Sequence, residues 1–333
     1  MNKENTNKIE KIECIKLDEI LKSLFTVSNK VLINMINTIF HENYSIKDTT
    51  ITQETPEFTI LQNNVLKSDL ILELKSKKKT QNYHIKFQTK NDKTSIKYMF
   101  EYDLLYAKQK YYEKRKQNND KIVFHMPEDI IIFIGENNIP NHMDMKIVLP
   151  DEQEKDYEIP VMKCSQYSTQ EMIQNKLYPL LPLQLFNFKE ELLKLNKEKT
   201  ENKDKIDDQM QKVMQSAKQT AEEIIKLQET GKINPEDMHI LLLAISNLFK
   251  YLNSKYGNDT KLNEKVNIII KTLYDSIVEE RGIKIGEIRG IISTYIEFKL
   301  EDDEIINKLK SNLNIDDEKA NKYLNNYYKE NKK

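Results

Sequence analysis

The sequence predicts an α+β protein, in which a mixed β-sheet with flanking helices is followed by an all-helical C-terminal region. Two observations predict this. The runs with strand character all end before Leu177, and after Lys189 the apolar residues recur at helical spacing with no convincing strand. We expect a loose N-terminal segment, a sheet-bearing domain, a helical region and a C-terminal helical hairpin, over residues 1–20, 21–188, 189–292 and 293–333.

The composition limits the class of protein. The chain has 333 residues, a formal net charge of −1 and 32% charged residues, so no overall field attracts nucleic acid. No apolar run reaches the roughly 18 residues that a membrane span needs. The N-terminal residues lack the apolar core of a signal peptide, and Cys14 and Cys164 form no spaced motif. We therefore expect a cytoplasmic protein with no membrane partner.

The elements before residue 65 follow from the spacing of apolar residues. Residues 21–40 have the pattern of an amphipathic helix, with a break near Ser28 and Asn29. Residues 46–60 alternate weakly and contain Pro56, which favours an edge strand or an irregular segment.

The central feature is a predicted hairpin. Two strand-like runs, residues 65–74 and 83–89, flank a polar turn with three successive lysines. Side chains alternate between the two faces of a strand. One face of the second run is therefore polar and consists of His84, Lys86 and Gln88. Pairing the apolar faces of the two runs places Asp69 beside Lys86.

The remaining elements of the sheet domain follow in order. Tyrosines at helical spacing predict a helix after the hairpin, and they are Tyr98, Tyr102, Tyr106 and Tyr112. Residues 129–134 form a continuous apolar run, which predicts a strand buried on both faces. Residues 145–149 and 157–161 predict two more strands, and the two prolines of residues 177–188 predict a packed corner.

The C-terminal region has only helical patterns. They cover residues 209–230, 235–255, 262–280, 302–310 and 316–328. Asp316 is a predicted N-cap. Gly282, Gly286 and Gly290 favour a close helix approach or a flexible joint over a phosphate-binding loop. The last two helices predict a plain hairpin rather than a helix-turn-helix, because they are rich in acidic residues.

Several stretches resemble the recombination-promoting nuclease and putative transposase (Rpn) family of the PD-(D/E)XK nuclease superfamily. In chain order they include INTIFHENYSI, SDLILEL, YHIKFQTKND, MFEYDLLYA, IIIFIGENNIP, YEIPVMK, YPLLPLQLFNF and ERGIKIGEIRG, and they cover most of residues 32–292. The resemblance implies that residues 21–188 form a nuclease core, a mixed sheet flanked by helices. It also implies DNA as the partner and Mg²⁺ as the metal that activates water to cleave a phosphodiester.

The resemblance also implies the site residues. The family pattern is an Asp on one strand, matched by Asp69, and Glu-x-Gln on the next, whose Gln is matched by Gln88. Lys86 stands at the Glu position. A metal site for phosphoryl chemistry needs oxygen ligands and negative charge, and an ammonium supplies neither. Either Glu54 or Glu57 is the candidate for the family's N-terminal acidic residue and a further metal ligand.

Two functions are consistent with this pattern. In the first, a transposase-like nuclease acts on DNA, with Asp69 holding Mg²⁺ and Gln88 orienting the phosphate or the water. In the second, a non-catalytic descendant serves DNA binding or protein assembly, as a homo-oligomer formed through the helical C-terminal region. Lys86 discriminates between them, since an Asp69–Lys86 ion pair would fill the former metal site.

Other residues have a plainer interpretation. Glu73 shares a face with Asp69, but four residues of strand separate them by roughly 13 Å, too far to share one metal. The lysines at 75 and 77–79 could contact phosphates, although a solvated turn is the preferred interpretation. Tyrosines at helical spacing are more typical of a core than of base stacking.

Overall fold

The computed structural model describes residues 16–54, 57–60, 64–67, 70–92, 94–114, 121–135, 138–197, 203–257, 260–297, 300–313 and 315–331. The chain forms two compact units, Met1–Ile270 and Lys271–Lys333. The boundaries that the sequence predicts after residues 20, 188 and 292 stay predictions.

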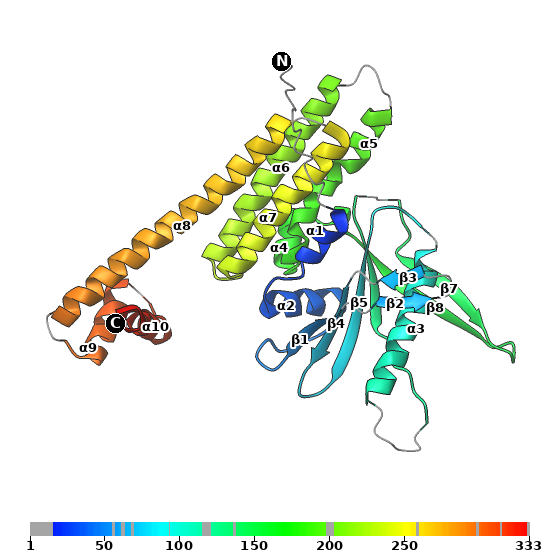
Figure 1. The fold of residues 1–333 in the computed structure, drawn as a ribbon, viewed down its shortest axis with the longest axis horizontal. Helices are drawn as coiled ribbons and strands as arrows, with labels where there is room; N and C mark the ends of the chain where they lie inside the picture. Colours follow the sequence, from blue (N-terminus) through cyan, green and yellow to red (C-terminus); the bar gives the residue numbers. More distant parts are fainter. Residues whose placement is uncertain are drawn as a thin grey trace, which may run out of the picture. The chain divides into compact units, whose positions relative to one another are not determined.

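A six-stranded mixed sheet forms the centre of the first unit, in the order β1-β4-β5-β6-β8-β7 (Figure 1). The strands are β1 (Thr50–Glu54), β4 (Leu70–Lys75), β5 (Thr80–Gln88), β6 (Glu128–Phe133), β7 (His142–Val148) and β8 (Glu154–Lys163). The β5–β6 and β6–β8 pairs are parallel and the other pairs antiparallel. The predicted mixed sheet is confirmed, and so is an edge strand, β1, within residues 46–60.

The predicted strand over residues 65–74 is wrong as one element. It is split between β3 (Asn64–Lys67), which pairs with β2 (Glu57–Ile60) in a separate two-stranded sheet, and β4. The reason is that β3 and β2 satisfy each other's backbone groups, while β4 is bonded on both edges, to β1 and β5.

The strand β6 confirms the prediction of a central, buried strand. Ile130 is 5% exposed, and the next four residues are fully buried. β6 has a parallel neighbour on each edge, and Ile131 and Phe133 pack against Ile96 and Met99. A strand covered on both faces has no place for alternating polar residues.

Helices cover both faces of the sheet. On one face lie α1 (Leu17–Ser23) and α2 (Asn29–Ile39), where the Phe40 and Tyr83 rings are 4.6 Å apart. The predicted break between them is confirmed at Ser28, whose backbone N–H and hydroxyl both donate to Asp237. On the other face lies α3 (Ser95–Lys114), whose Tyr102 and Tyr106 pack on Ile71.

The remaining elements of the first unit are mostly helical. They are η2 (Cys164–Gln166), α4 (Thr169–Gln174), η3 (Tyr178–Phe188), α5 (Lys189–Lys197), α6 (Lys203–Glu229), α7 (Pro235–Leu252) and η4 (Asn253–Gly257). The predicted packed corner is confirmed, because η3 is a largely buried 3₁₀ segment with Pro182 inside it. The capping box of Asn234 and Asp237 starts α7.

The helix α8 (Thr260–Glu297) crosses the boundary between the units, and α9 (Asp302–Leu313) and α10 (Asp317–Asn331) follow it in the second unit. Ile292, Leu309 and Leu324 form part of an apolar core there. The carboxylate of Asp316 accepts the Lys319 backbone N–H at 2.8 Å, which confirms the predicted N-cap. A Cβ added to Gly290 would meet nothing within 4 Å, so close packing does not explain this glycine.

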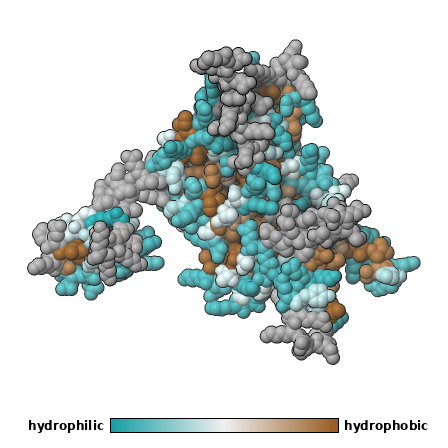
Figure 2. Space-filling model, viewed as in Figure 1, coloured by the Kyte–Doolittle hydropathy of each residue, from teal (hydrophilic) through white to brown (hydrophobic). Residues whose placement is uncertain are grey.

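The surface in view is mainly hydrophilic. Teal, hydrophilic residues make up most of the coloured area in Figure 2. In the described part of the chain, every helix is too short or too polar to cross a membrane.

Candidate functional site

The structure places the predicted site residues on different elements. Asp69 lies outside the described residues, and so does the predicted pairing with Lys86. The last described pair of the β4–β5 ladder is Leu70 with Ile85. Lys86 is half-buried and Gln88 is buried on β5, on the face that α3 covers. The predicted shared face of these two residues is confirmed.

Gln88 is a buried polar group with an unmatched acceptor. Its side chain is aimed at the end of the strand, where Nε2 lies 3.5 Å from the Asp92 carbonyl. Its Oε1 is buried and has no hydrogen-bond partner among the described residues. Such atoms are rare in folded proteins because burial without a partner is costly. Stability therefore does not explain why a glutamine occupies position 88.

The acidic candidates do not gather beside Lys86. Glu54 is on the edge strand β1, two strands from β5 and thus roughly 10 Å away. It accepts hydrogen bonds from the Tyr106 hydroxyl at 3.1 Å and from Lys110 Nζ at 2.7 Å. Glu57 belongs to β2 in the separate two-stranded sheet, and its side chain lies outside the described part.

Three lysines around the β4–β5 turn form ion pairs with carboxylates. The ion pairs are Lys75–Glu73 at 2.7 Å, Lys77–Asp48 at 2.9 Å and Lys79–Glu42 at 2.5 Å. Lys75 and Lys77 are largely exposed, so their pairs contribute little to stability. These contacts fit the preferred interpretation of a solvated turn.

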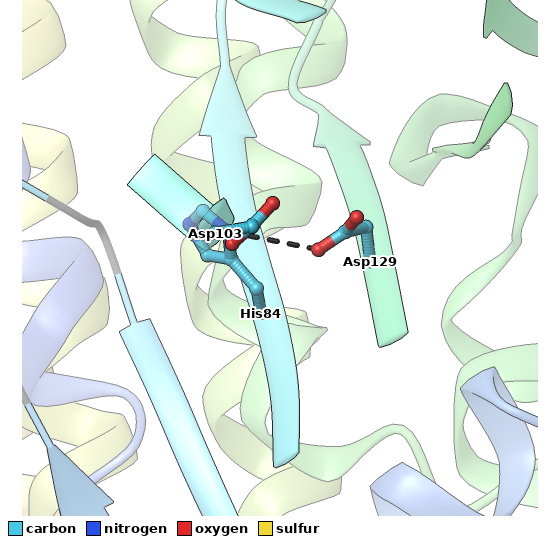
Figure 3. Close-up of side chains that lie close together, drawn as sticks. All are labelled: His84, Asp103 and Asp129. Atoms are coloured by element: carbon cyan, nitrogen blue, oxygen red, sulfur yellow. Dashed lines mark hydrogen bonds and ion pairs between the residues drawn. The ribbon is translucent and has the colours of Figure 1, made fainter. Parts of the chain in front are cut away.

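Three titratable side chains converge on the same face of the sheet, two residues along β5 from Lys86. His84 of β5 and Asp129 of β6 are register partners, and Asp103 reaches them from α3 (Figure 3). Asp103 lies on the buried stripe of α3, between Tyr102 and Tyr106. The parallel register and the helical spacing therefore bring the three together.

The cluster is closely connected. His84 Nδ1 lies 2.7 Å from Asp103 Oδ1 and 3.7 Å from Asp129 Oδ1. The hydroxyl of Tyr157, on β8, donates to Asp103 Oδ2 at 3.2 Å and to Asp129 Oδ2. The side chains of His84, Asp103 and Asp129 are 3%, 0% and 6% exposed. Water hardly reaches this cluster.

Burial dominates the electrostatics of the cluster. It raises the pKa of Asp103 to about 7, although hydrogen bonds from Asp129 and Tyr157 lower it. Burial also raises the pKa of Asp129 well above its ordinary value, and the nearby charge of Asp103 raises it further. Two carboxylates this close cannot both ionise without a compensating cation or proton.

The arrangement has the donor types of a metal site. One ligand atom each from His84, Asp103 and Asp129 lies within 4.8 Å of the others. Imidazole and carboxylate ligands suit Zn²⁺, Mn²⁺ and Fe²⁺. Oδ1 of Asp129 is also without a hydrogen-bond partner among the described residues. The cluster can therefore hold an ion or a shared proton, but it is too buried for a DNA phosphodiester to reach it.

No family model, curated protein or solved structure matches this chain. Function therefore rests on the residues of the site, since a fold alone does not determine an activity.

Sequence reasoning missed the cluster of His84, Asp103 and Asp129, and also Tyr157. The histidines have no metal-ligand spacing along the chain, because the partners come from three separate elements. One signal was available. Asp103 interrupts the apolar stripe of α3, and an acidic residue on a buried stripe requires a partner.

Proposed function

We propose that this chain is a transposase-like protein of the PD-(D/E)XK nuclease type, which acts on DNA and in which Lys86 has disabled metal-dependent phosphodiester hydrolysis. The observation that carries the proposal is the place of Lys86. It is half-buried on the inner strand β5, on the face under α3, two residues before the buried Gln88.

The fold supports the proposal at a coarse level. The resemblance implies a mixed sheet with flanking helices, and the chain has an antiparallel β4–β5 pair, a crossover through α3 and a parallel strand β6. The buried, unmatched Oε1 of Gln88 supports a role for this residue beyond packing.

Electrostatics support the loss of hydrolysis. An ammonium a few ångströms from a divalent cation costs a few kcal/mol even at an effective dielectric constant of about 20. The Glu that the resemblance expects would be a ligand, so Lys86 also removes one oxygen donor. The same ammonium can contact a DNA phosphate directly, which is compatible with DNA binding without cleavage.

The test compares cleavage with binding. Supercoiled plasmid is incubated with Mg²⁺ or Mn²⁺ and wild type, Asp69→Ala or Lys86→Glu protein, and binding to a labelled duplex is measured at low salt. We expect wild type to bind the duplex without nicking the plasmid. Nicking by wild type that Asp69→Ala abolishes would show an active nuclease, and failure to bind DNA would remove DNA as the partner. Assembly through the C-terminal helices stays a prediction.

A further inference from the structure

A second feature lies where β5 and β6 end. Residues after both strands, together with α5 and η4, surround a cavity of about 400 Å³. Its wall begins at Thr89, the residue after Gln88. Ligands of sheets with parallel strands commonly bind beyond the carboxyl ends of these strands. The cavity is therefore in a position that suits a ligand.

The described lining of this cavity is strongly basic. Its charged residues are Lys90, Lys189, Lys194, Lys197, Lys255 and Glu190. The whole chain has a net charge of −1, so this concentration of lysines is local. Lys194 and Lys197 are exposed. The cavity therefore favours an anion.

Buried contacts fix the floor of the cavity. Lys189 is only 9% exposed, and its Nζ donates to the Thr89 carbonyl at 2.7 Å, which ties α5 to the end of β5. Gly135 has a φ of +78°, and a Cβ there would lie 2.8 Å from the Phe186 carbonyl oxygen. Only glycine allows this close approach of the two backbones.

Aromatic side chains form another wall. Tyr251 and Tyr256 both line the cavity, and Lys255 Nζ lies 5.3 Å from the centroid of the Tyr251 ring. Phosphate groups bind ammonium groups, and bases pack on aromatic rings. The volume is within the range of small-molecule sites, roughly 300–1,000 Å³. These properties together fit a nucleotide better than a simple inorganic anion.

We propose that this pocket binds a phosphate-bearing nucleotide unit, free or at the end of a single DNA strand. Lys90, Lys194 and Lys197 contact the phosphate, and the two tyrosines provide the wall for the base. The inference deepens the proposed function and rests on it for the strand-bound ligand. The inference differs from the proposed function because it names a ligand-binding pocket that is separate from Lys86.

The test uses charge reversal with a matched control. The probes are a 5′-phosphorylated single-stranded oligonucleotide, the same oligonucleotide without the phosphate, and deoxyadenosine monophosphate. They are titrated into wild type, Lys194→Glu/Lys197→Glu and the control Lys212→Glu/Lys232→Glu. All four lysines are exposed and the two double variants change the net charge equally. Lys86 and its neighbours on β5 are unchanged in every variant.

We expect the pocket variant to weaken binding of the phosphorylated strand on the order of tenfold, and the control variant to change it little. The unphosphorylated strand should bind more weakly to wild type, and the mononucleotide should compete with the phosphorylated strand. Equal weakening in both double variants would overturn the pocket while leaving the proposed action on DNA intact. Pocket-dependent binding of the mononucleotide without binding of any DNA would support the pocket and overturn the proposed function.

Discussion

Nδ1 of His84 and Oδ1 of Asp103 lie 2.7 Å apart, and both side chains are almost fully buried. This contact joins the inner strand β5 to the helix α3 that covers it. Asp129 and Tyr157 connect the same cluster to β6 and β8. The protonation state of a few buried groups therefore affects how four elements are held together.

The first prediction concerns pH and Asp103. Its pKa is raised to about 7 in the folded protein, mainly by burial, so the folded state binds more protons than the unfolded state between the two pKa values. This proton binding at Asp103 stabilises the folded state. The stabilisation is complete below the unfolded pKa near 3.8 and is lost as pH rises through about 7. We expect wild type to lose about 2–3 kcal/mol of unfolding free energy between about pH 5 and about pH 8 relative to Asp103→Asn.

Urea unfolding at several pH values measures this loss. Asp156→Asn, at an exposed position of β8, is the control. Its unfolding free energy should change with pH as that of wild type does. If the unfolding free energies of Asp103→Asn and wild type changed equally with pH, Asp103 would be ionised over the whole pH range, as a partner of a protonated His84.

The second prediction concerns Tyr157. Tyr157→Phe removes the hydroxyl that donates to both carboxylates, so we expect a loss of about 1–3 kcal/mol of unfolding free energy. The loss should grow with pH, because ionised carboxylates depend more on the donor. Tyr98→Phe on α3, where Tyr98 is 49% exposed, should change stability by less than about 0.5 kcal/mol. Equal effects of the two substitutions in urea unfolding would contradict the described network.

The third prediction concerns Gln88. Gln88→Met should leave the unfolding free energy unchanged or raise it by about 1 kcal/mol, because the buried Oε1 has no partner to lose. Gln184 is the matched control, since it is also buried but donates to Tyr167 and accepts from Asn187, both at 2.9 Å. Gln184→Met should cost about 1–3 kcal/mol. A comparable loss at Gln88 would mean that its amide is bonded in the folded protein.

Some elements were predictable because one local rule decides them. The continuous apolar run that became β6 has no alternation, and only a strand or helix covered on every side tolerates that pattern. Asn234 and Asp237 form a capping box. The sequence indicates it by a capping residue with an acidic residue three positions later. Local chemistry of this kind needs no knowledge of the partner elements.

Other features depend on pairing over long distances. Nothing in residues 65–74 shows that β3 pairs with β2 while β4 pairs with β1 and β5, so alternation alone predicted one strand. His84 contacts Asp103 only because α3 packs over β5. Asp129 lies beside His84 only because of the register between β5 and β6. The basic pocket likewise collects lysines from segments that are far apart in the sequence.

We propose that Lys86 prevents metal binding at Asp69. The test is isothermal titration of Mn²⁺ or Mg²⁺ into wild type, Lys86→Glu and Asp69→Ala/Lys86→Glu. The double variant separates this site from the buried His84 cluster, which keeps all its ligands in every variant. We predict a binding event that is present in Lys86→Glu and absent from both wild type and the double variant. Equally tight binding in wild type and Lys86→Glu, with plasmid cleavage by wild type that Asp69→Ala abolishes, would contradict the claim.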